Sequence, residues 1–581
     1  MQRRLLAFAG ACAFIALSLS FPSHPANAAG GSELDAALEA IAAYAPAAMR
    51  EQGAPGLSIA ITDRTGTLRI ITLGYANRES RTPVTAQTRF AIGSITKSMT
   101  ALSLLQLKDA GRLDLDAPVQ HYLPWFSIDS GKRPVLVHEL LSHTSGLPDD
   151  FADEMSYKYD IVALRKAKTL FPPGTSWSYS NDGYATLGAI LAGLDRRTWA
   201  DSLQARVLGP IGMDDSSPVF TPEVMAVNTA VGYGFRDNDR PPSLAPALTP
   251  SSATDFVDPA GSVLSTPEDM ARYMRFYLNG GKTASGSQLI APATFAEMTR
   301  PDRLTNGKLA GSRDAVLGEW PAFYREYGYG LSIFDDNGDR LIGHTGGVSG
   351  YTACMQMNLT RGFGVIALSN LIEAPLHPCA IVRYAMRVLR AQSVGDALPT
   401  PAPAPDPETV EHAADYAGTY TSPNGGSLRV TSDGNRLHLV DGTKAIALYP
   451  RGSGSFWADD PKYATFLLLF GRNRTGSVVD MTYGSQWYPN ERYRGPLRFT
   501  YPALWNALVG RYEIAYFGMP MVTRVLIVKN RLTFDGDTPI EPLSNGTFQL
   551  GDSIVRFDAY AGDRAQRLNV DDVHLYRVEL P

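Results

Sequence analysis

The sequence predicts an α+β domain, an antiparallel sheet flanked by helices with a helical subdomain, followed by two small all-β antiparallel barrels. Within residues 29–396, strand-like segments lie at both ends and helix-like segments lie between them. A proline-rich stretch, LPTPAPAPDPE, then follows and is interpreted as a linker at 397–408. Beyond it, a weak repeat of about ninety residues is rich in short strands with glycine and asparagine turns, which favours barrels.

The first domain is expected to build one sheet from its two ends. An amphipathic helix is expected at 33–51, and strands at 56–63 and 68–77 follow it around an Arg-Thr-Gly turn. Four short strands from 327 onward alternate with Asn-Gly-Asp and Arg-Gly turns, and a helix at about 376–392 closes the unit. Strands at both ends of a domain favour a single sheet that contains all of them.

The two barrels are predicted from the repeat, with boundaries at 409–500 and 501–581. YAGTY and GNRLHLVDG in the first copy correspond to LVGRY and KNRLTFDGD in the second. Gly-x-Tyr motifs start at Gly418 and Gly510. The apolar segment at 512–521 is interpreted as a strand, with a loop that gates a binding site as the alternative.

The N-terminus is interpreted as an export signal. Arg3 and Arg4 precede a short apolar segment, and ANA at 26–28 offers a small-residue cleavage site. Residues 1–28 are therefore predicted to be removed, and the protein is expected to be secreted or periplasmic. Cys354 and Cys379 are expected to remain after removal, and in an oxidising compartment they could be either paired or free.

Composition argues against nucleic acid and a membrane as partners and leaves the oligomeric state open. The net charge is −5, and no long run of lysine or arginine points to nucleic acid or an anionic membrane. No later apolar stretch reaches spanning length. Phosphate loops, dinucleotide fingerprints and a Gly-x-Ser-x-Gly elbow are absent, so no cofactor is expected. His138 and His143 lie five residues apart, unlike the four of a His-Glu-x-x-His zinc motif, so no metal is expected.

Ser94 and Lys97 form a Ser-x-x-Lys motif at the start of a predicted helix. Residues three apart share one helix face, and a helix start favours negative charge. A lysine held against a buried face shifts towards its neutral form and could then take the proton of the serine. The motif alone does not separate this activated nucleophile from an exposed surface lysine.

Two further segments could complete such a site. Tyr179 and Asn181 lie between a Pro-Gly turn and a predicted helix, where a tyrosine could transfer a proton or simply pack as an aromatic ring. The other segment enters a strand, where glycines admit close backbone approach and a bare N–H can bind an oxyanion. A glycine-rich bulge on an edge strand is the alternative. This segment consists of His344, Thr345, Gly346 and Gly347.

Together these segments resemble the serine β-lactamase and penicillin-binding-protein superfamily over roughly residues 33–392. TRFAIGSITKSMTALSLLQL, VHELLSHTSGLP, PPGTSWSYSNDGY, YGYGL and GHTGGVSGY all look like its recurring segments. The resemblance is greatest to the class C β-lactamase-like branch, which includes esterases, D-aminopeptidases and D-alanyl-D-alanine carboxypeptidases. D-aminopeptidase members also resemble this chain in carrying two small barrels after the catalytic domain.

The resemblance implies a serine hydrolase that works through an acyl-enzyme on Ser94, with a small molecule or a short peptide as its substrate. Lys97 and Tyr179 would share the general-base work, and Asn181 would bind the amide or ester arm of the substrate. The backbone N–H groups of Ser94 and Gly347 would form the oxyanion hole.

His344 stands where true β-lactamases and transpeptidases commonly have a lysine. A histidine at neutral pH is mostly uncharged and suits a substrate carboxylate less well. The expected substrates are therefore D-amino acid-containing peptides, amides or esters. β-Lactamase or D-Ala-D-Ala carboxypeptidase activity is the alternative, and a non-catalytic protein that binds wall fragments or a partner on this fold is a further one.

Overall fold

The computed structural model describes residues 28–578 except 149–155, 236–247, 251–257, 313–325, 373–377, 402–405, 407, 453, 517–518, 537, 552 and 571–572. The predicted export signal therefore lies outside the described residues, apart from its last residue. No helix among the residues in these ranges is both long enough and apolar enough to cross a membrane.

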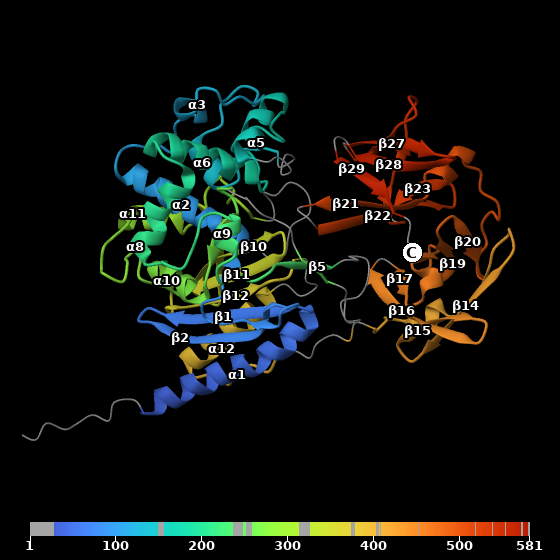
Figure 1. The fold of residues 1–581 in the computed structure, drawn as a ribbon, viewed down its shortest axis with the longest axis horizontal. Coiled ribbons are helices and arrows are strands. Elements are labelled where there is room, and N and C mark those ends of the chain that lie inside the picture. The colour runs from blue at the N-terminus through green and yellow to red at the C-terminus, as the bar shows by residue number, and fades with distance from the viewer. Residues whose placement is uncertain are drawn as a thin grey trace, which may run out of the picture.

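A single antiparallel sheet of eight strands forms the centre of the first domain (Figure 1). Its strand order is β3-β2-β1-β12-β11-β10-β9-β8, so strands from the two ends of the domain meet where β1 pairs with β12. This confirms the predicted sheet. The strands are β1 (Gly56–Asp63), β2 (Thr67–Asn77), β3 (Thr82–Pro83), β8 (Glu326–Tyr327), β9 (Ser332–Asp336), β10 (Asp339–Val348), β11 (Tyr351–Asn358) and β12 (Phe363–Ser369).

Two helices, α1 (Ala28–Gln52) and α12 (Cys379–Val394), pack together and cover one face of the sheet (Figure 1). The alternation along β1 explains how both faces are filled. Leu57 and Ile59 belong to the apolar core under α1 and α12, whereas Ala60 belongs to the core on the opposite face. A disulfide joins Cys354 of β11 to Cys379 at the start of α12, which settles the open pairing.

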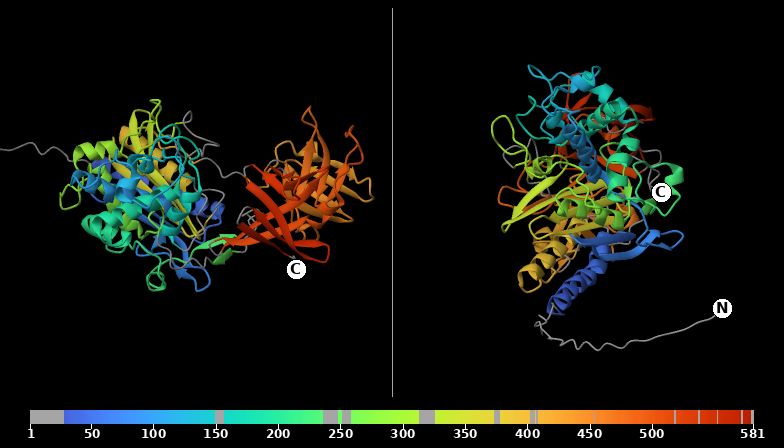
Figure 2. Two further views of the ribbon diagram at one scale, coloured as in Figure 1. Left: turned by 90° about the horizontal axis from the view of Figure 1, so that it is seen from above. Right: turned by 90° about the vertical axis from the view of Figure 1, so that its left-hand side faces the viewer.

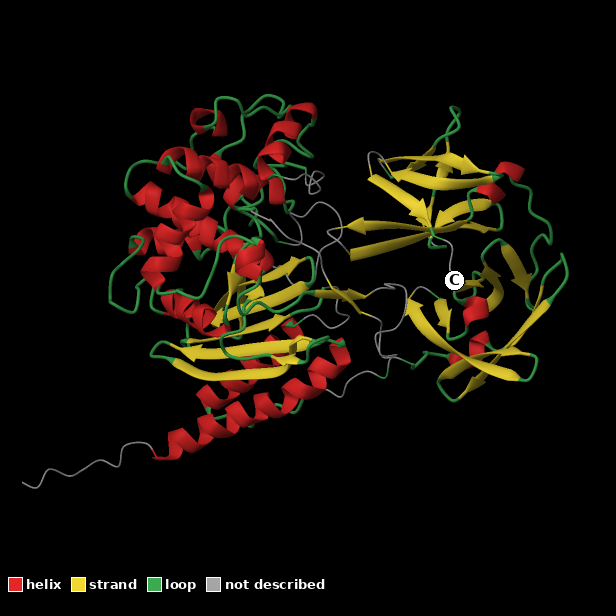
Figure 3. Cartoon of the chain, viewed as in Figure 1, coloured by secondary structure: helices red, strands yellow, loops and turns green. Residues whose placement is uncertain are grey.

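Helices and loops between β3 and β8 cover the other face of the sheet and build the predicted helical subdomain (Figure 3). Within it, α2 (Thr96–Asp109) is buried along almost its whole length, and α10 (Pro267–Leu278) packs on β1 and β12. The other helices are α3 (Val119–Tyr122), α4 (Val137–Leu141), α5 (Tyr157–Ala163), α6 (Asn181–Asp195), α7 (Trp199–Leu203), α8 (Gly209–Ile211), α9 (Pro222–Met225) and α11 (Pro292–Met298). Short strand pairs join β4 (Phe90–Ala91) to β7 (Leu264–Ser265) and β5 (Tyr233–Phe235) to β6 (Leu248–Pro250).

The C-terminal part contains two nearly closed antiparallel sheets, as predicted (Figure 3). The first has eight strands: β13 (Gly418–Thr421), β14 (Ser427–Asp433), β15 (Arg436–Asp441), β16 (Lys444–Gly452), β17 (Ser455–Ala458), β18 (Leu468–Arg472), β19 (Val478–Tyr483) and β20 (Gln486–Pro489). The second has nine: β21 (Gly510–Tyr516), β22 (Met519–Val528), β23 (Arg531–Phe534), β24 (Thr538–Pro539), β25 (Glu541–Pro542), β26 (Phe548–Leu550), β27 (Ser553–Ala561), β28 (Arg564–Val570) and β29 (Val573–Arg577).

The repeated motifs occupy equivalent places in the two barrels. Gly418 and Gly510 each begin the first strand of a barrel. Two residues after each glycine, a tyrosine hydroxyl donates to a backbone carbonyl four residues earlier in the chain. Tyr420 donates to the carbonyl of Tyr416 at 2.6 Å, and Tyr512 donates to the carbonyl of Leu508 at 2.8 Å. The repeat therefore preserves the way in which each barrel starts, where a buried tyrosine ties the first strand to the preceding 3₁₀ turn.

The two barrels lie beside each other in Figure 1, and they lie beside the α+β domain both there and in the left view of Figure 2. Lys529 of the second barrel forms a 2.8 Å ion pair with Asp480 of the first. In the predicted strand segment 512–521, residues 512–516 belong to β21 and residues 519–521 to β22, which agrees with the interpretation as strand for the part that the structure describes. Strand β22 contacts β5 of the α+β domain.

Candidate active site

Ser94 lies on a 3₁₀ turn, η1 (Gly93–Ile95), which leads directly into α2. The prediction of a helix that opens at Ser94 is therefore wrong in detail, and the neighbouring glycine explains the difference. Gly93 has a φ of 52°, and a Cβ there would lie 2.6 Å from the backbone nitrogen of Gly347. The turn is thus pressed against β10, while Ser94 itself stays partly exposed.

Lys97 is fully buried, which rejects the surface-lysine alternative. Its Nζ donates to Asn181 Oδ1 at 2.6 Å and to the carbonyl of Ala260 at 2.9 Å. The Ser94 Oγ lies 3.0 Å from the same nitrogen. The two carbonyl oxygens among these three neighbours can only accept a hydrogen bond, whereas the serine hydroxyl can accept or donate one.

The cap of α6 places Asn181 at Lys97. The side chain of Ser180 accepts a hydrogen bond from the N–H of Gly183 at 3.1 Å, so Ser180 is the N-cap and Asn181 the first helical residue. Tyr179, which precedes the N-cap Ser180, has its ring centroid 4.8 Å from Lys97 Nζ. The Tyr-x-Asn segment therefore contributes both side chains to the surroundings of the lysine.

His143 holds the backbone on both sides of Tyr179. Its carbonyl accepts from the N–H of Ser178 at 3.0 Å, and its Nδ1 accepts from the N–H of Ser180 at 3.1 Å. The two rings of His143 and Tyr179 lie 4.2 Å apart between centroids. Burial, together with the charge of Lys97, holds the pKa of His143 well below its usual value, so the ring stays neutral and its Nδ1 stays an acceptor.

His344 is also fully buried, and both of its ring nitrogens have partners. Its Nδ1 lies 2.5 Å from the carbonyl of Thr345, and its Nε2 lies 2.8 Å from the hydroxyl of Tyr327. A carbonyl can only accept, so Nδ1 carries the proton and Tyr327 donates to Nε2. Burial lowers the pKa of His344 to about 3, an effect that the Thr345 hydrogen bond opposes and Lys97 reinforces.

The glycines after Thr345 bring β10 against the serine turn. A Cβ on Gly346 would lie 1.8 Å from the carbonyl oxygen of Ile92, so only glycine fits there. Gly347 is exposed and its backbone contacts Gly93, the neighbour of Ser94. This arrangement sets the backbone of Gly347 beside that of the serine turn.

The structure thus brings Ser94, Tyr179, Asn181 and the segment 344–347 together near the buried Lys97. Three participants were not identified from the sequence: the Ala260 carbonyl, His143 and Tyr327. The Ala260 carbonyl has no side-chain signal. His143 lies in the HTSG segment and Tyr327 opens the YGYGL segment, so both had a detectable motif without an assigned role.

The two histidines weighed as metal ligands do not face one another as a pair. His138 Nδ1 contacts Asp302 at 3.3 Å, whereas His143 turns to the Tyr179 segment. Within the part of the chain that the structure describes, no group of three or more histidine, cysteine, aspartate or glutamate side chains is placed to hold a metal ion.

Comparison with known families agrees with this geometry. The family model described as Beta-lactamase matches residues 41–377, more than half of the chain. The protein therefore belongs to the Beta-lactamase family, whose members are typically serine hydrolases.

Curated relatives and a solved structure extend the comparison. The chain is 29% identical over 384 residues to Penicillin-binding protein 4 of Amycolatopsis lactamdurans. This match covers 64% of the present chain and 95% of the relative. It is also 28% identical over 398 residues to Beta-lactamase-like protein 2 of Dictyostelium discoideum, a match that covers 65% of the present chain and 67% of that relative. The octameric penicillin-binding protein homologue from Pyrococcus abyssi shares the fold, with a TM-score of 0.56 at 24% identity over 78% of this chain and 99% of that one.

Proposed function

We propose that the protein hydrolyses amide or ester bonds of small substrates through an acyl-enzyme on Ser94. The observation that carries this proposal is the set of acceptors around Lys97 Nζ. In the neutral form that can act as a base, the Lys97 amine has two N–H groups and one lone pair. The carbonyl oxygens of Asn181 and Ala260 take the two N–H groups, so the lone pair is left for the hydroxyl proton of Ser94.

In the proposed acylation step, Lys97 accepts the proton of Ser94 while Oγ attacks the substrate carbonyl carbon. The carbonyl π electrons move to the oxygen, and the backbone N–H groups of Ser94 and Gly347 bind the resulting oxyanion. Collapse of the tetrahedral intermediate expels the amine or alcohol, which receives a proton through Tyr179. Water then attacks the acyl carbonyl carbon while Lys97 accepts its proton, and the second tetrahedral intermediate collapses by breaking the bond to Ser94 Oγ. The serine oxygen takes that proton back, and the carboxylic acid product leaves.

The substrate we propose has a D-amino acid residue with a free amino end and an amide or ester at the scissile position. Support comes from His344, which is neutral at physiological pH and whose nitrogens contact Thr345 and Tyr327. A neutral, internally bonded imidazole gives little attraction to a free carboxylate. The D configuration rests on the resemblance to D-aminopeptidases with two C-terminal barrels.

Acylation by a β-lactam is the second candidate, because a relative of 29% identity is named a penicillin-binding protein. We further propose that the protein acts outside the cytoplasm after removal of residues 1–28. The disulfide between Cys354 and Cys379 supports this location, since disulfides persist in oxidising compartments.

Intact-protein mass spectrometry of the signal-free chain tests these proposals. The wild type, Ser94→Ala and a control, Ser80→Ala, would be incubated with D- and L-alanine p-nitroanilide, p-nitrophenyl acetate and benzylpenicillin. Ser80 is exposed in the turn after β2 and serves as the matched serine. We expect adducts or turnover in the wild type and Ser80→Ala only.

Each outcome has a definite meaning. Hydrolysis that survives Ser94→Ala would remove Ser94 as the nucleophile. Reaction with benzylpenicillin alone would favour the β-lactam candidate, and equal rates on D- and L-alanine p-nitroanilide would reject the D preference. Binding of a probe without any adduct or product would favour a non-catalytic protein on this fold.

A further inference from the structure

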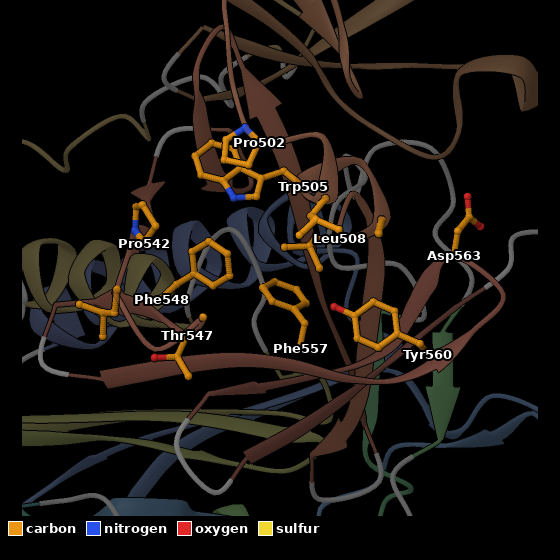
Figure 4. A pocket seen from close by; sticks show the side chains of 13 residues that line it. Pro502, Trp505, Leu508, Pro542, Thr547, Phe548, Phe557, Tyr560 and Asp563 are labelled. Atoms are coloured by element: carbon orange, nitrogen blue, oxygen red, sulfur yellow. The ribbon is translucent and has the colours of Figure 1, made fainter.

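The second barrel contains a cavity of about 440 Å³ at one end of its apolar core. Trp505 and Leu508, from the 3₁₀ turn η7 (Ala503–Ala507) and the residue after it, form one wall. Phe548 of β26 and Phe557 of β27 form another (Figure 4). The volume lies within the range of small-molecule sites, and the mouth of a β-barrel is a common place for one.

Four aromatic rings line this cavity. The ring centroids of Trp505 and Phe548 lie 6.3 Å apart, and those of Phe548 and Phe557 lie 5.7 Å apart at 90°. Tyr560, 56% exposed, continues the same wall to the rim. Rings set at steep angles to one another can surround a guest from several sides, and the negative potential of an aromatic face attracts an organic cation.

The charge of the lining also favours a cation. Asp563, exposed in the turn between β27 and β28, lines the cavity, whereas no lysine, arginine or histidine that the structure describes does so. Among the residues that the structure describes, the Asp563 carboxylate has no hydrogen-bond or ion-pair partner. A carboxylate beside aromatic rings, with no competing cation in the lining, repels anions and favours a positively charged guest.

We propose that this cavity binds a small organic ammonium ion, with its apolar body among the rings and its charge towards Asp563. The proposal is independent of the chemistry at Ser94. Such a cation could be a free amine or the ammonium headgroup of a lipid, and both present the same group to the cavity.

Titration calorimetry on the full signal-free chain tests the charge preference. The probes are choline and its uncharged isostere 3,3-dimethylbutan-1-ol, which has the same shape with carbon in place of nitrogen. We expect choline to bind roughly five- to thirtyfold more tightly, the range that cation–π attraction supplies. Equal affinities would overturn the assignment of an ammonium site, and so would a lack of choline binding.

Two alanines of η7 provide a matched pair of variants. Ala507 lines the cavity, whereas Ala503 is exposed on the same turn outside it. Ala507→Trp fills the cavity and is expected to abolish choline binding, while Ala503→Trp leaves it unchanged. If Ala507→Trp does not fold, Tyr560→Leu at the exposed rim replaces it, with a loss of about fivefold expected. Choline binding that survives a folded Ala507→Trp would overturn the site.

Asp563→Asn separates the role of charge from that of shape. We expect it to weaken choline several-fold and to leave 3,3-dimethylbutan-1-ol unchanged. Sedimentation with phosphatidylcholine or phosphatidylglycerol vesicles then distinguishes the sources. Binding to phosphatidylcholine vesicles that Ala507→Trp abolishes identifies a lipid headgroup, whereas retained choline binding without vesicle binding identifies a free amine.

Discussion

At the scale of single residues, the site is organised by groups whose hydrogen-bonding capacity leaves little choice. Two carbonyl oxygens at Lys97 Nζ can only accept hydrogen bonds, whereas the Ser94 hydroxyl at the same nitrogen can give up a proton. His344 is similarly limited by the Thr345 carbonyl, which determines its tautomer. The chemistry we propose depends on these constraints more than on any single short distance.

His143 is expected to act as a positioning residue for Tyr179. Its carbonyl and Nδ1 accept from the two amides that flank this tyrosine. His143→Leu leaves the Ser180 N–H unsatisfied and should lower kcat by roughly ten- to hundredfold, with KM little changed. His143→Asn can still accept the bond and tolerates the φ of 60° found here, so it should recover much of the rate.

Steady-state kinetics of both variants on one substrate checks this expectation. A purely structural role would lower the melting temperatures of the two variants without separating their kcat values. Equal losses in His143→Leu and His143→Asn would therefore contradict the positioning role.

The buried His344 should make stability depend on pH. Its folded pKa of about 3 lies below the ordinary value of 6.5, so the unfolded chain binds the proton more readily. Stability from this group is therefore lost as pH falls below 6.5. Relative to His344→Gln, the wild type should lose about 2 kcal/mol more between pH 7 and pH 5. Urea unfolding at both pH values measures this difference, and parallel losses in the two proteins would contradict it.

At the scale of elements, the site exists because a 3₁₀ turn and a strand approach at van der Waals distance. Glycine makes this possible at Gly93 and Gly346, where any side chain would meet backbone atoms. Because η1 leads into α2 and β10 lies within the sheet, this contact fixes the position of Ser94 relative to the sheet.

Gly346→Ala should separate these elements. Its Cβ would lie 1.8 Å from the Ile92 carbonyl oxygen, so β10 or the serine turn must move. We expect at least a hundredfold loss of kcat, in line with the cost of displacing catalytic groups by about 1 Å. Gly66→Ala is the matched control, since nothing lies within 4 Å of a Cβ there. Wild-type kcat in Gly346→Ala would contradict the close approach.

The disulfide ties β11 to α12 across one face of the sheet. It closes a loop with a sequence separation of 25 residues, for which chain-entropy arguments give about 3 kcal/mol of stabilisation. The double variant Cys354→Ala, Cys379→Ala should lose about this much free energy of unfolding in urea. Unchanged stability under a reducing agent, with thiol labelling proving reduction, would contradict this role.

At the scale of the whole molecule, charges fasten the two barrels to each other. Asp480 of the first barrel is almost fully buried and pairs with Lys529 of the second, whose Nζ also lies 5.6 Å from the Tyr493 ring centroid. Such a buried carboxylate is costly without its partner. The barrels are therefore expected to unfold as a coupled pair.

Lys529→Met should lower the free energy of unfolding by about 2 kcal/mol, because it leaves Asp480 unpaired. Lys529→Arg keeps the charge and should stay close to the wild type. The double variant Asp480→Asn, Lys529→Met should be more stable than Lys529→Met alone. Thermal unfolding of these three variants and the wild type tests the ion pair. An unaltered melting temperature in Lys529→Met would contradict its contribution.

Local patterns in the sequence were sufficient for much of the architecture. Alternation in GLSIAITD predicts β1, and the Gly-x-Tyr repeat predicts equivalent starts for two barrels, because strand and turn preferences act over a few residues. The Ser-x-x-Lys spacing likewise places Ser94 and Lys97 together through local helical geometry.

Tertiary structure alone decided how that motif is completed. The carbonyl at Ala260, the clamp from His143 and the bond between Tyr327 and His344 join segments far apart in the chain. The burial of Lys97 and the pairing of Cys354 with Cys379 also depend on how sheet and helices pack. The sequence by itself determined which elements form and which residues could react. Only packing determined the environment of each reactive atom, because burial and long-range hydrogen bonds are properties of the folded chain.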